Sequence, residues 1–462
     1  MWMATEWPTT TIPAKATTAG STSRDCNRVP TCCASATTRG GATASTCSSP
    51  TGWNKTSGGD QSLIAPDFWV RQRPGGLVKT IRACLLLSLS VLMLGCDPVP
   101  PEPPSPPVLR DLVPGCDGSR LAARDPDPSQ RGPWTVGARS LEIGDLWVEV
   151  LYPAAPGSEA GATPMEADLR DGLPESQRAL VTDEKNPEVR CDCFSDLPLD
   201  KEAGPYPVIF FVHGTASWRT QSLSLMTHWA SRGFIVAAAD HPGLWLADLL
   251  AGICGEPVGA RQDLNRDLRQ LHEAFQLGSG GLAFLADHVN LDRIAVAGHS
   301  AGASAAAGAG DLPGVQTVIS LAGNRSVIPN PDLRSALFLG GMTDQVIPFS
   351  QTQRAYTETA QTSRLLGITG GGHLIFSDIC ELTNSDGQNL VEIATEAGVC
   401  GTQFASQLFD CAASTIPPAE AKRLVNTAST WVLEQDLHCA VGASDFEMLV
   451  DDDWIEVLEV KD

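Results

Sequence analysis

The sequence predicts an α/β fold with a mostly parallel central sheet flanked by helices. Three observations support this prediction. Apolar runs of strand length recur along the chain, and one of them leads through a glycine-framed turn into a helix of small residues at 298–309. Polar residues suited to chemistry follow the later strands, at the edge where open α/β sheets build their sites.

The apolar run at residues 208–212 predicts a strand, and His213-Gly214-Thr215-Ala216 follows it. A glycine here permits close approach of the backbone. An oxyanion hole needs two backbone N–H groups aimed at the developing charge, and we expect one of them from this loop. Thr215 is the predicted donor, with Ala216 as the alternative.

Residues 293–297 predict a buried strand, GHSAG follows at 298–302, and an alanine-rich helix is expected at 303–309. Strand, G-x-S-x-G and helix are the context of a nucleophile elbow, in which a serine on a strained turn stands clear of the sheet. The two glycines avoid collisions with the neighbouring strand or helix. Ser300 is therefore the predicted nucleophile, and the N–H of Ala301 is the second predicted oxyanion donor.

The strands predicted at 335–341 and 364–369 supply the remaining groups. Asp344 follows the first of them and is flanked by glycines and a proline, which suits a buried orienting carboxylate. His373 follows the second after three glycines, on a flexible loop at the same sheet edge. Serine is a poor nucleophile until a base takes its proton. We predict His373 as that base and Asp344 as the acid that fixes its tautomer.

Other acids and histidines have structural interpretations. Asp332 lies before its strand and is expected to be a turn residue. Asp378 is either a partner of His373 or a solvated surface acid. His213 is expected to be a structural loop residue, and His241 to hydrogen-bond the loop after its strand. The histidines are scattered, and no H-E-x-x-H or paired C-x-x-C spacing occurs, so neither a metal nor a cofactor is predicted.

These segments resemble α/β-hydrolases of the dienelactone hydrolase, platelet-activating-factor acetylhydrolase and cutinase-like polyesterase group. The resemblance covers about residues 132–438. It rests on LWVEVLYP at 146–153, VHGT at 212–215, GFIVAAADHPG at 233–243, GHSAG at 298–302, TD at 343–344 and GHL at 372–374. By position it implies a triad of Ser300, Asp344 and His373. It also implies Thr215 and Ala301 as the oxyanion donors.

The chain departs from the secreted polyesterases at two positions. Those enzymes carry an aromatic residue where Thr215 stands and often a methionine where Ala301 stands. This departure argues against polyester cleavage and leaves hydrolysis of a small-molecule or lipid ester as what the resemblance implies. An amidase or peptidase using the same triad is one alternative. A non-catalytic binding module on a hydrolase scaffold is the other, because a fold does not fix a function.

Two stretches are expected to shape the pocket. Residues 243–250 are rich in apolar side chains and would line a subsite or pack as a half-buried helix. Ala216, His299 and Trp245 are the candidate pocket residues, with His299 on the pocket floor. A final helix at about 417–437 carries a helical apolar stripe and is expected to cover the sheet.

Residues 83–94 form a short apolar run preceded by basic residues. This pattern predicts a signal peptide at 78–95, too short for a transmembrane span. Residues 94–96 (LGC) resemble the end of a bacterial lipobox, in which Cys96 becomes the acylated first residue. We therefore expect an exported, lipid-anchored protein of the bacterial cell envelope. A plain cleaved signal and a secreted protein are the alternative.

The predicted organisation follows from this boundary. Residues 1–77 are rich in Thr, Ser, Gly and Cys; they are expected to be disordered, or to precede a natural start near Val78. Residues 96–131 contain a proline-rich tether. The catalytic domain is expected to have a polar, acidic surface insert and a cysteine-containing insert, and to be followed by an acidic tail. The respective ranges are 132–440 for the domain, about 157–205 and about 378–415 for the inserts, and 441–462 for the tail.

The chain is acidic, with 32 Lys and Arg against 54 Asp and Glu. Nucleic acid and anionic membrane surfaces repel such a chain. We therefore expect no nucleic-acid partner, membrane contact only through the lipid anchor, and a monomer.

Eight cysteines follow Cys96, and an even number in an exported protein favours disulfides. The four cysteines between Cys380 and Cys439 are expected to staple the second insert. Cys191 and Cys193 are separated by one residue, and each is expected to pair elsewhere rather than with the other.

Overall fold

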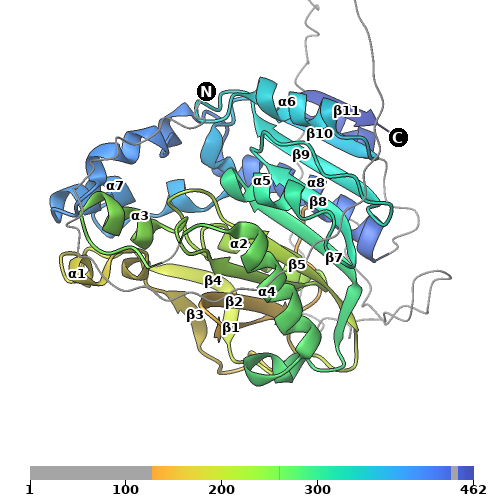
Figure 1. Cartoon of the computed structure of the whole chain (residues 1–462), viewed down its shortest axis with the longest axis horizontal. Coiled ribbons are helices and arrows are strands. Elements are labelled where there is room, and N and C mark those ends of the chain that lie inside the picture. The colour runs from red at the N-terminus through yellow and green to blue at the C-terminus, as the bar shows by residue number, and fades with distance from the viewer. Residues whose placement is uncertain (1–126, 260, 439–445, 462) are drawn as a thin grey trace, which may run out of the picture. The chain divides into compact units, whose positions relative to one another are not determined.

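The computed structural model describes residues 127–259, 261–438 and 446–461. Across them runs one 11-stranded sheet in the order β11-β10-β9-β8-β7-β5-β6-β2-β1-β4-β3 (Figure 1). The predictions for the N-terminal extension, the signal peptide, Cys96 and all but the last five residues of the proline-rich tether lie outside these residues. Cys116 and Cys439 lie outside them as well.

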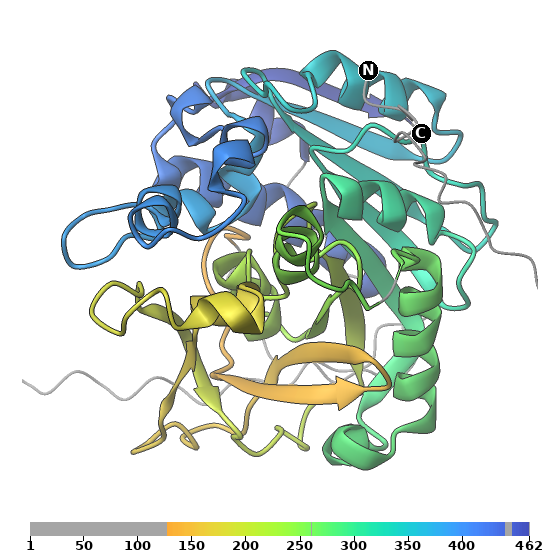
Figure 2. The same ribbon diagram turned by 60° about the vertical axis from the view of Figure 1, so that its left-hand side comes forward.

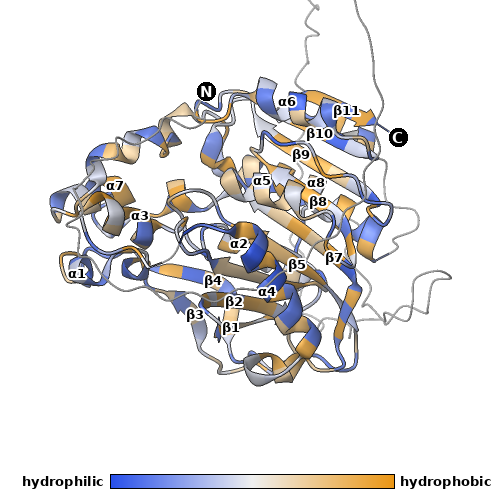
Figure 3. Cartoon of the chain, in the orientation of Figure 1, coloured by the Kyte–Doolittle hydropathy of each residue, from blue (hydrophilic) through white to orange (hydrophobic). Residues whose placement is uncertain are grey.

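Six neighbouring strands form the parallel centre of the sheet. Nearly all of their residues are buried, because helices cover both faces, and they read as continuous apolar runs (Figure 3). The strands predicted at 208–212, 293–297, 335–341 and 364–369 are confirmed. The six strands are β6 (Ile235–Asp240), β5 (Tyr206–Val212), β7 (Val289–His299), β8 (Val315–Leu321), β9 (Ser335–Gly341) and β10 (Ser363–Ile368).

The register of these strands aligns their carboxyl ends. Val212 at the end of β5 lies opposite Gly298 of β7, and His299 lies opposite Leu321 of β8. Ile368 at the end of β10 lies opposite Gly341 of β9. The loops that carry the predicted site residues therefore leave the sheet at one edge.

Helices pack on both faces of the sheet. Two of them share an apolar cluster on one face, α2 (Leu223–Ser231) and α8 (Pro418–Leu437). The opposite face is covered by α4 (Leu264–Leu277), α5 (Ala301–Gly308) and α6 (Phe349–Glu358). The last helix expected at about 417–437 is confirmed as α8, with Leu424, Val425, Ala428 and Val432 buried.

The remaining strands extend the sheet on both sides. β1 (Val136–Ile143) and β2 (Leu146–Pro153) form an antiparallel hairpin that joins β6 through β2. The acidic insert was expected to be a surface excursion, and this is wrong in part. It contributes β3 (Pro164–Ala167) and β4 (Val189–Ser195), which pair with each other, and β4 also pairs with β1. Buried Met165, Val189 and Cys193 hold these strands in the core.

The acidic tail at 441–462 was expected to follow the domain, but part of it belongs to the sheet. Residues Ile455–Lys461 form β11, antiparallel to β10 at the sheet edge. The apolar residues between its acids explain this: Val457 packs on one face of the sheet, and Leu458 and Val460 pack on the other. Alternation with period two places them so.

The disulfides differ from the sequence expectation in two respects. Cys191 and Cys193 are bonded to each other. They lie in an irregular stretch of β4, between the pairs Arg190–Glu166 and Phe194–Pro164, where four steps along β4 match two along β3. This bulge brings the two Cα atoms to 5.1 Å, within the range of a disulfide.

Within the described residues, one disulfide, Cys380–Cys411, links two parts of the second insert as expected. Cys400 instead pairs with Cys254, in the segment after β6. Short helices of three separate segments meet around this second bond, α1 (Glu175–Arg178), α3 (Leu246–Ile253) and α7 (Leu390–Glu396) (Figure 2). The segments that carry these helices share a small apolar cluster, with Leu173 just before α1, Leu250 in α3 and Ile393 in α7. Residues 246–253 are thus a half-buried helix, one of the two predicted possibilities.

No helix in residues 127–259, 261–438 and 446–461 is both long and apolar enough to cross a membrane.

Candidate active site

Ser300 lies on the turn between β7 and α5, as the sequence predicts. Its backbone has φ 57° and ψ −116°, a conformation that residues other than glycine rarely adopt. The N–H of Ser300 donates to the carbonyl of Leu321 at 2.9 Å, which fixes the turn against β8. The strained geometry is that of a nucleophile elbow.

Two glycines permit this turn by their lack of a side chain. A Cβ atom on Gly298 would lie 2.2 Å from the carbonyl oxygen of Gly302. A Cβ atom on Gly302 would lie 2.1 Å from the carbonyl oxygen of Val212 in β5. Both neighbours are backbone atoms of packed strands or helices and have little room to move. The G-x-S-x-G spacing therefore has the steric cause that the sequence suggested.

We predict that Gly302→Ala lowers the free energy of unfolding by roughly 2–3 kcal/mol, because the new methyl group collides with β5. Helix propensity alone would favour alanine over glycine by about 1 kcal/mol. Denaturant unfolding measures the difference. Gly259→Ala is the control, since a Cβ atom there meets nothing within 4 Å. Equal stabilities of the two variants would contradict the steric explanation.

The structure brings His373 and Asp344 together. Nδ1 of His373 donates to Oδ2 of Asp344 at 2.8 Å, and both side chains are buried. The other oxygen of Asp344 accepts the N–H groups of Val346 and Ile347, each at 2.8 Å. Three hydrogen bonds thus fix the carboxylate. A proton held on Nδ1 leaves Nε2 as the basic nitrogen of His373.

His299 directly precedes Ser300 in the chain and contacts His373. Its ring centroid is 4.7 Å from that of His373, and its Nε2–H donates to the carbonyl of His373 at 2.9 Å. Ser300 as a residue is 8% exposed. Its hydroxyl donates no hydrogen bond to any of the described residues. In free enzymes the contact of nucleophile and base is often long and tightens with substrate.

Gln221 connects this histidine pair to the loop after β5, and sequence reasoning missed it. Its Oε1 accepts the N–H of Gly214 at 2.9 Å. Its Nε2 donates to Nδ1 of His299 at 3.3 Å. The amide therefore fixes the tautomer of His299 with the proton on Nε2. Burial and the neighbouring His373 hold the pKa of His299 well below its usual value, so the ring stays neutral.

The loop after β5 passes directly beside Ser300. A Cβ atom on Gly214 would lie 3.3 Å from Cβ of Ser300. Nδ1–H of His213 donates to the carbonyl of Gly214 at 2.8 Å. In a trans peptide the carbonyl and the following N–H point in opposite directions. The N–H of Thr215 therefore points away from His213.

The two N–H groups that the sequence offered from this loop, those of Thr215 and Ala216, differ in their hydrogen bonds. The N–H of Ala216 donates to the carbonyl of Leu244 at 3.0 Å and is thus occupied. The N–H of Thr215 donates to no group among the described residues. Ala301 is the first residue of α5, where helix N–H groups lack intrahelical partners. Within the part of the chain that the structure describes, the N–H groups of Thr215 and Ala301 donate to no other group.

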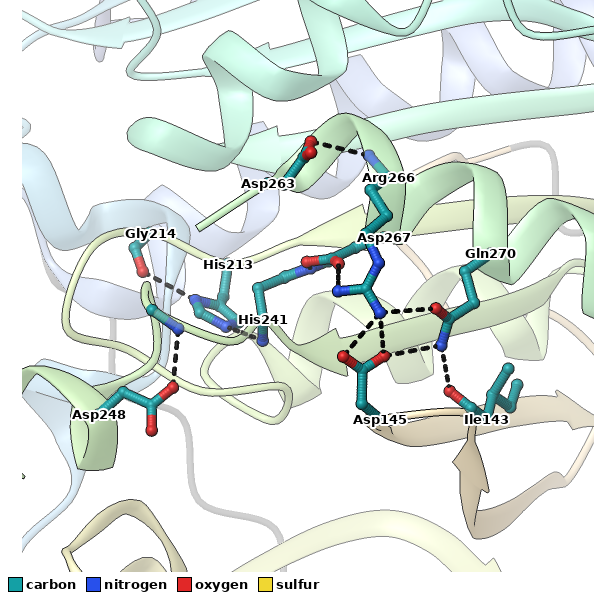
Figure 4. Close-up of polar contacts among 11 residues, drawn as sticks. Ile143, Asp145, His213, Gly214, His241, Asp248, Asp263, Arg266, Asp267 and Gln270 are labelled. Atoms are coloured by element: carbon teal, nitrogen blue, oxygen red, sulfur yellow. Dashed lines mark hydrogen bonds and ion pairs between the residues drawn. The ribbon is translucent and has the colours of Figure 1, made fainter. Parts of the chain in front are cut away.

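His213 and His241 form a buried network behind this loop (Figure 4). Nε2 of His213 accepts the N–H of His241 at 3.1 Å, and Nδ1 of His241 donates to Asp267 of α4 at 3.0 Å. Burial, together with the nearby His241, lowers the pKa of His213 to about 3, so His213 is neutral. Both histidines hold loops in place, which confirms the structural interpretation of each.

An ion cluster holds the far end of the same loop. Arg219 pairs with Asp240 at the end of β6 and lies 3.7 Å from buried Glu149 of β2. The N–H of Arg219 also donates to Asp240 at 2.7 Å. Burial raises the pKa of both carboxyl groups. No spacing in the sequence marks these three residues as neighbours, since β2 and β6 meet only in the folded sheet.

The other candidate acids lie away from the triad positions. Asp332 is an exposed turn residue whose N–H donates to Asn330, as predicted. Asp378 was expected to be either a partner of His373 or a solvated surface acid. Its carboxylate instead binds protein groups other than His373. Its carboxylate accepts the N–H of Ser224 at 2.9 Å and pairs with Lys422 at 3.0 Å, which ties the histidine loop to α2 and α8.

The candidate pocket residues lie around the same loop. Trp245 precedes α3 and pairs with Ser217 in an isolated parallel bridge, so it is adjacent to Ala216. Trp218 packs with Leu374 and Ile379 in an apolar cluster that begins directly after His373. One side of the site is therefore apolar. Among the described residues, no group of three or more His, Cys, Asp or Glu could hold a metal ion.

The chain was also compared with known protein families and structures. The model of the chlorophyllase family matches residues 197–310, which include β5, the loop at Gly214 and the elbow at Ser300. No curated protein matches the chain. Among solved structures, the ferulic acid esterase from Streptomyces cinnamoneus matches with a TM-score of 0.46 and 19% identity. That match covers 69% of this chain and 93% of the esterase.

Proposed function

We propose that Ser300, His373 and Asp344 form the catalytic triad of a carboxylic ester hydrolase. The fold is that of an α/β-hydrolase, and the family match supports ester hydrolysis. One observation carries the proposal. A buried, carboxylate-bonded histidine lies at the sheet edge where a serine stands on a strained elbow. The free N–H groups of Thr215 and Ala301 at the same edge support it.

The reaction follows from these positions. Nε2 of His373 takes the hydroxyl proton of Ser300 while Oγ attacks the ester carbonyl carbon. The carbonyl oxygen becomes an oxyanion, which the N–H groups of Thr215 and Ala301 stabilise. Collapse of this intermediate expels the alcohol, which receives the proton from His373, and leaves an acyl group on Ser300. Water activated by His373 then attacks the acyl carbon and releases the acid.

Asp344 acts through His373 at every proton transfer. Its Oδ2 holds the proton on Nδ1, so Nε2 faces the reaction as a base. When His373 becomes an imidazolium, the same carboxylate stabilises the charge. The apolar cluster of Trp218, Leu374 and Ile379 beside the base favours an ester with an apolar acyl or alcohol part.

We predict that the purified full chain hydrolyses p-nitrophenyl esters and reacts covalently with a fluorophosphonate probe. Both readouts require an activated serine, and only the first requires turnover. The assay measures kcat/KM from acetate to laurate, and matching p-nitroanilides test the amidase alternative. Faster cleavage of the anilides would favour the amidase. A folded protein that neither labels nor hydrolyses any ester would leave only the binding module.

A further inference from the structure

The histidine loop, residues 370–373, is held by a segment that comes about 40 residues later, which we call the clamp (residues 410–416). The carbonyl of Gly370 accepts the N–H groups of Thr415 at 2.7 Å and Ile416 at 3.2 Å. The N–H of Gly372 donates to the hydroxyl of Ser414 at 3.0 Å. The clamp therefore satisfies the backbone on both sides of the glycines that precede the base.

Asp410 of the clamp binds the backbone of His373 itself. Its Oδ2 accepts the N–H of His373 at 2.9 Å. Its Oδ1 is buried and accepts no hydrogen bond from the described residues. Among the described residues, the N–H of His373 is thus the group that holds this carboxylate by a hydrogen bond.

His373 is consequently fixed at three points by three side chains. Asp410 holds its N–H, His299 holds its carbonyl, and Asp344 holds Nδ1 of its ring. The backbone bonds set the position of Cα, and the ring bond sets the direction in which Nε2 points. A catalytic base needs both, because small errors in its position cost rate steeply.

A disulfide links the clamp to the segment that follows the histidine loop. Cys411, the neighbour of Asp410, is bonded to Cys380, seven residues after His373, with 5.5 Å between their Cα atoms. This bond closes a loop of the chain with a sequence separation of 31. Holding Asp410 in place without the bond would cost the closure entropy of that loop.

We propose that Asp410 is a positioning residue for His373 and that the Cys380–Cys411 disulfide holds it in place. The proposal rests on the proposed role of His373 as the base. Asp410 does not touch the reacting atoms; it acts through the backbone of the base.

Asp410→Ala is expected to lower kcat roughly 10- to 100-fold with little change in KM, because the base is displaced while the apolar cluster beside it stays. Asp410→Asn keeps an oxygen that can accept the N–H of His373 and is expected to restore most of the rate. Asp386→Ala is the matched control: Asp386 lies on the same insert, and its carboxylate pairs with Lys185 on the surface. A kcat for Asp410→Ala within twofold of the wild type would overturn the proposal.

Backbone hydrogen exchange gives a readout that needs no activity. The amide of His373 is expected to exchange faster in Asp410→Ala and to keep its protection in Asp410→Asn and Asp386→Ala. Unchanged protection in Asp410→Ala would overturn the contact even if the rate falls. A wild-type chain without any esterase activity or probe labelling would overturn the proposed function, whatever the exchange shows.

The disulfide is tested by comparing the two staples. The double change Cys380→Ser and Cys411→Ser is expected to lower kcat about as much as Asp410→Ala, and adding Asp410→Ala should then cost less than in the wild type. The double change at Cys254 and Cys400 is expected to leave kcat near the wild-type value. A full, additive loss from Asp410→Ala without the Cys380–Cys411 bond would show that the disulfide does not hold Asp410. If the serine variants do not fold, mild reduction of the wild type gives the same comparison.

Discussion

Ser300→Ala is expected to reduce kcat for ester hydrolysis by roughly 10³-fold or more and to abolish fluorophosphonate labelling. Alanine nearly keeps the volume of the side chain but removes the hydroxyl oxygen that we propose attacks the carbonyl. Residue 300 adopts φ 57° in either case, and alanine and serine both carry a Cβ atom. The backbone strain is therefore unchanged, and the fold should persist. Stopped and continuous p-nitrophenyl assays, with gel labelling, measure the effect.

Ser304→Ala is the control for this change. Ser304 lies one turn further along α5, and its hydroxyl contacts Asn324 at the surface. Its replacement should leave both rate and labelling unchanged. Retention of labelling in Ser300→Ala would mean that another residue reacts, and the assignment of the nucleophile would be wrong.

Asp344→Asn is expected to lower kcat by about 10⁴-fold, because it reverses the tautomer of His373. The N–H groups of Val346 and Ile347 require an acceptor at the Oδ1 position, so the amide oxygen of asparagine takes that place. The NH₂ group then faces Nδ1 of His373 and forces the ring proton onto Nε2. A protonated Nε2 cannot accept the proton of Ser300. Steady-state kinetics with the ester that the wild type cleaves fastest measures the loss.

Asp332→Asn is the control for the acid, since Asp332 is an exposed turn residue just before β9, the strand that Asp344 follows. It should hydrolyse esters at the wild-type rate. A larger loss in Asp332→Asn than in Asp344→Asn would move the acid to the earlier position. Equal thermal stability of the two variants would show that the kinetic difference is chemical.

Features encoded by short stretches could be predicted from the sequence. The apolar strands, the elbow and the glycine loop before His373 each lie within about ten residues, and their geometry has a local steric cause. The collision that requires Gly298, with the carbonyl oxygen of Gly302, is of this kind, whereas the one that requires Gly302 is with Val212 of β5. The order of nucleophile, acid and base along the chain then follows from strands that end at one edge.

Contacts between distant segments could not be predicted in this way. Gln221 is an ordinary polar residue until the fold places it between Gly214 and His299. Asp410 lies in an insert without periodicity, and its place depends on which cysteines pair. The bond between Cys191 and Cys193 depends on a bulge in β4, because two cysteines separated by one residue in a regular strand lie too far apart to bond. In each case the deciding distance is set by tertiary structure.

The edge strand β11 has a consequence for how the domain is completed during synthesis. β10 carries the base loop at its end, and one of its two sides is covered only by residues 455–461. The chain makes these residues well after β10, so β10 has an open edge until they are in place. Open apolar edges recruit strands from other chains. The protection of the strand that leads to His373 from such association therefore depends on residues 455–461.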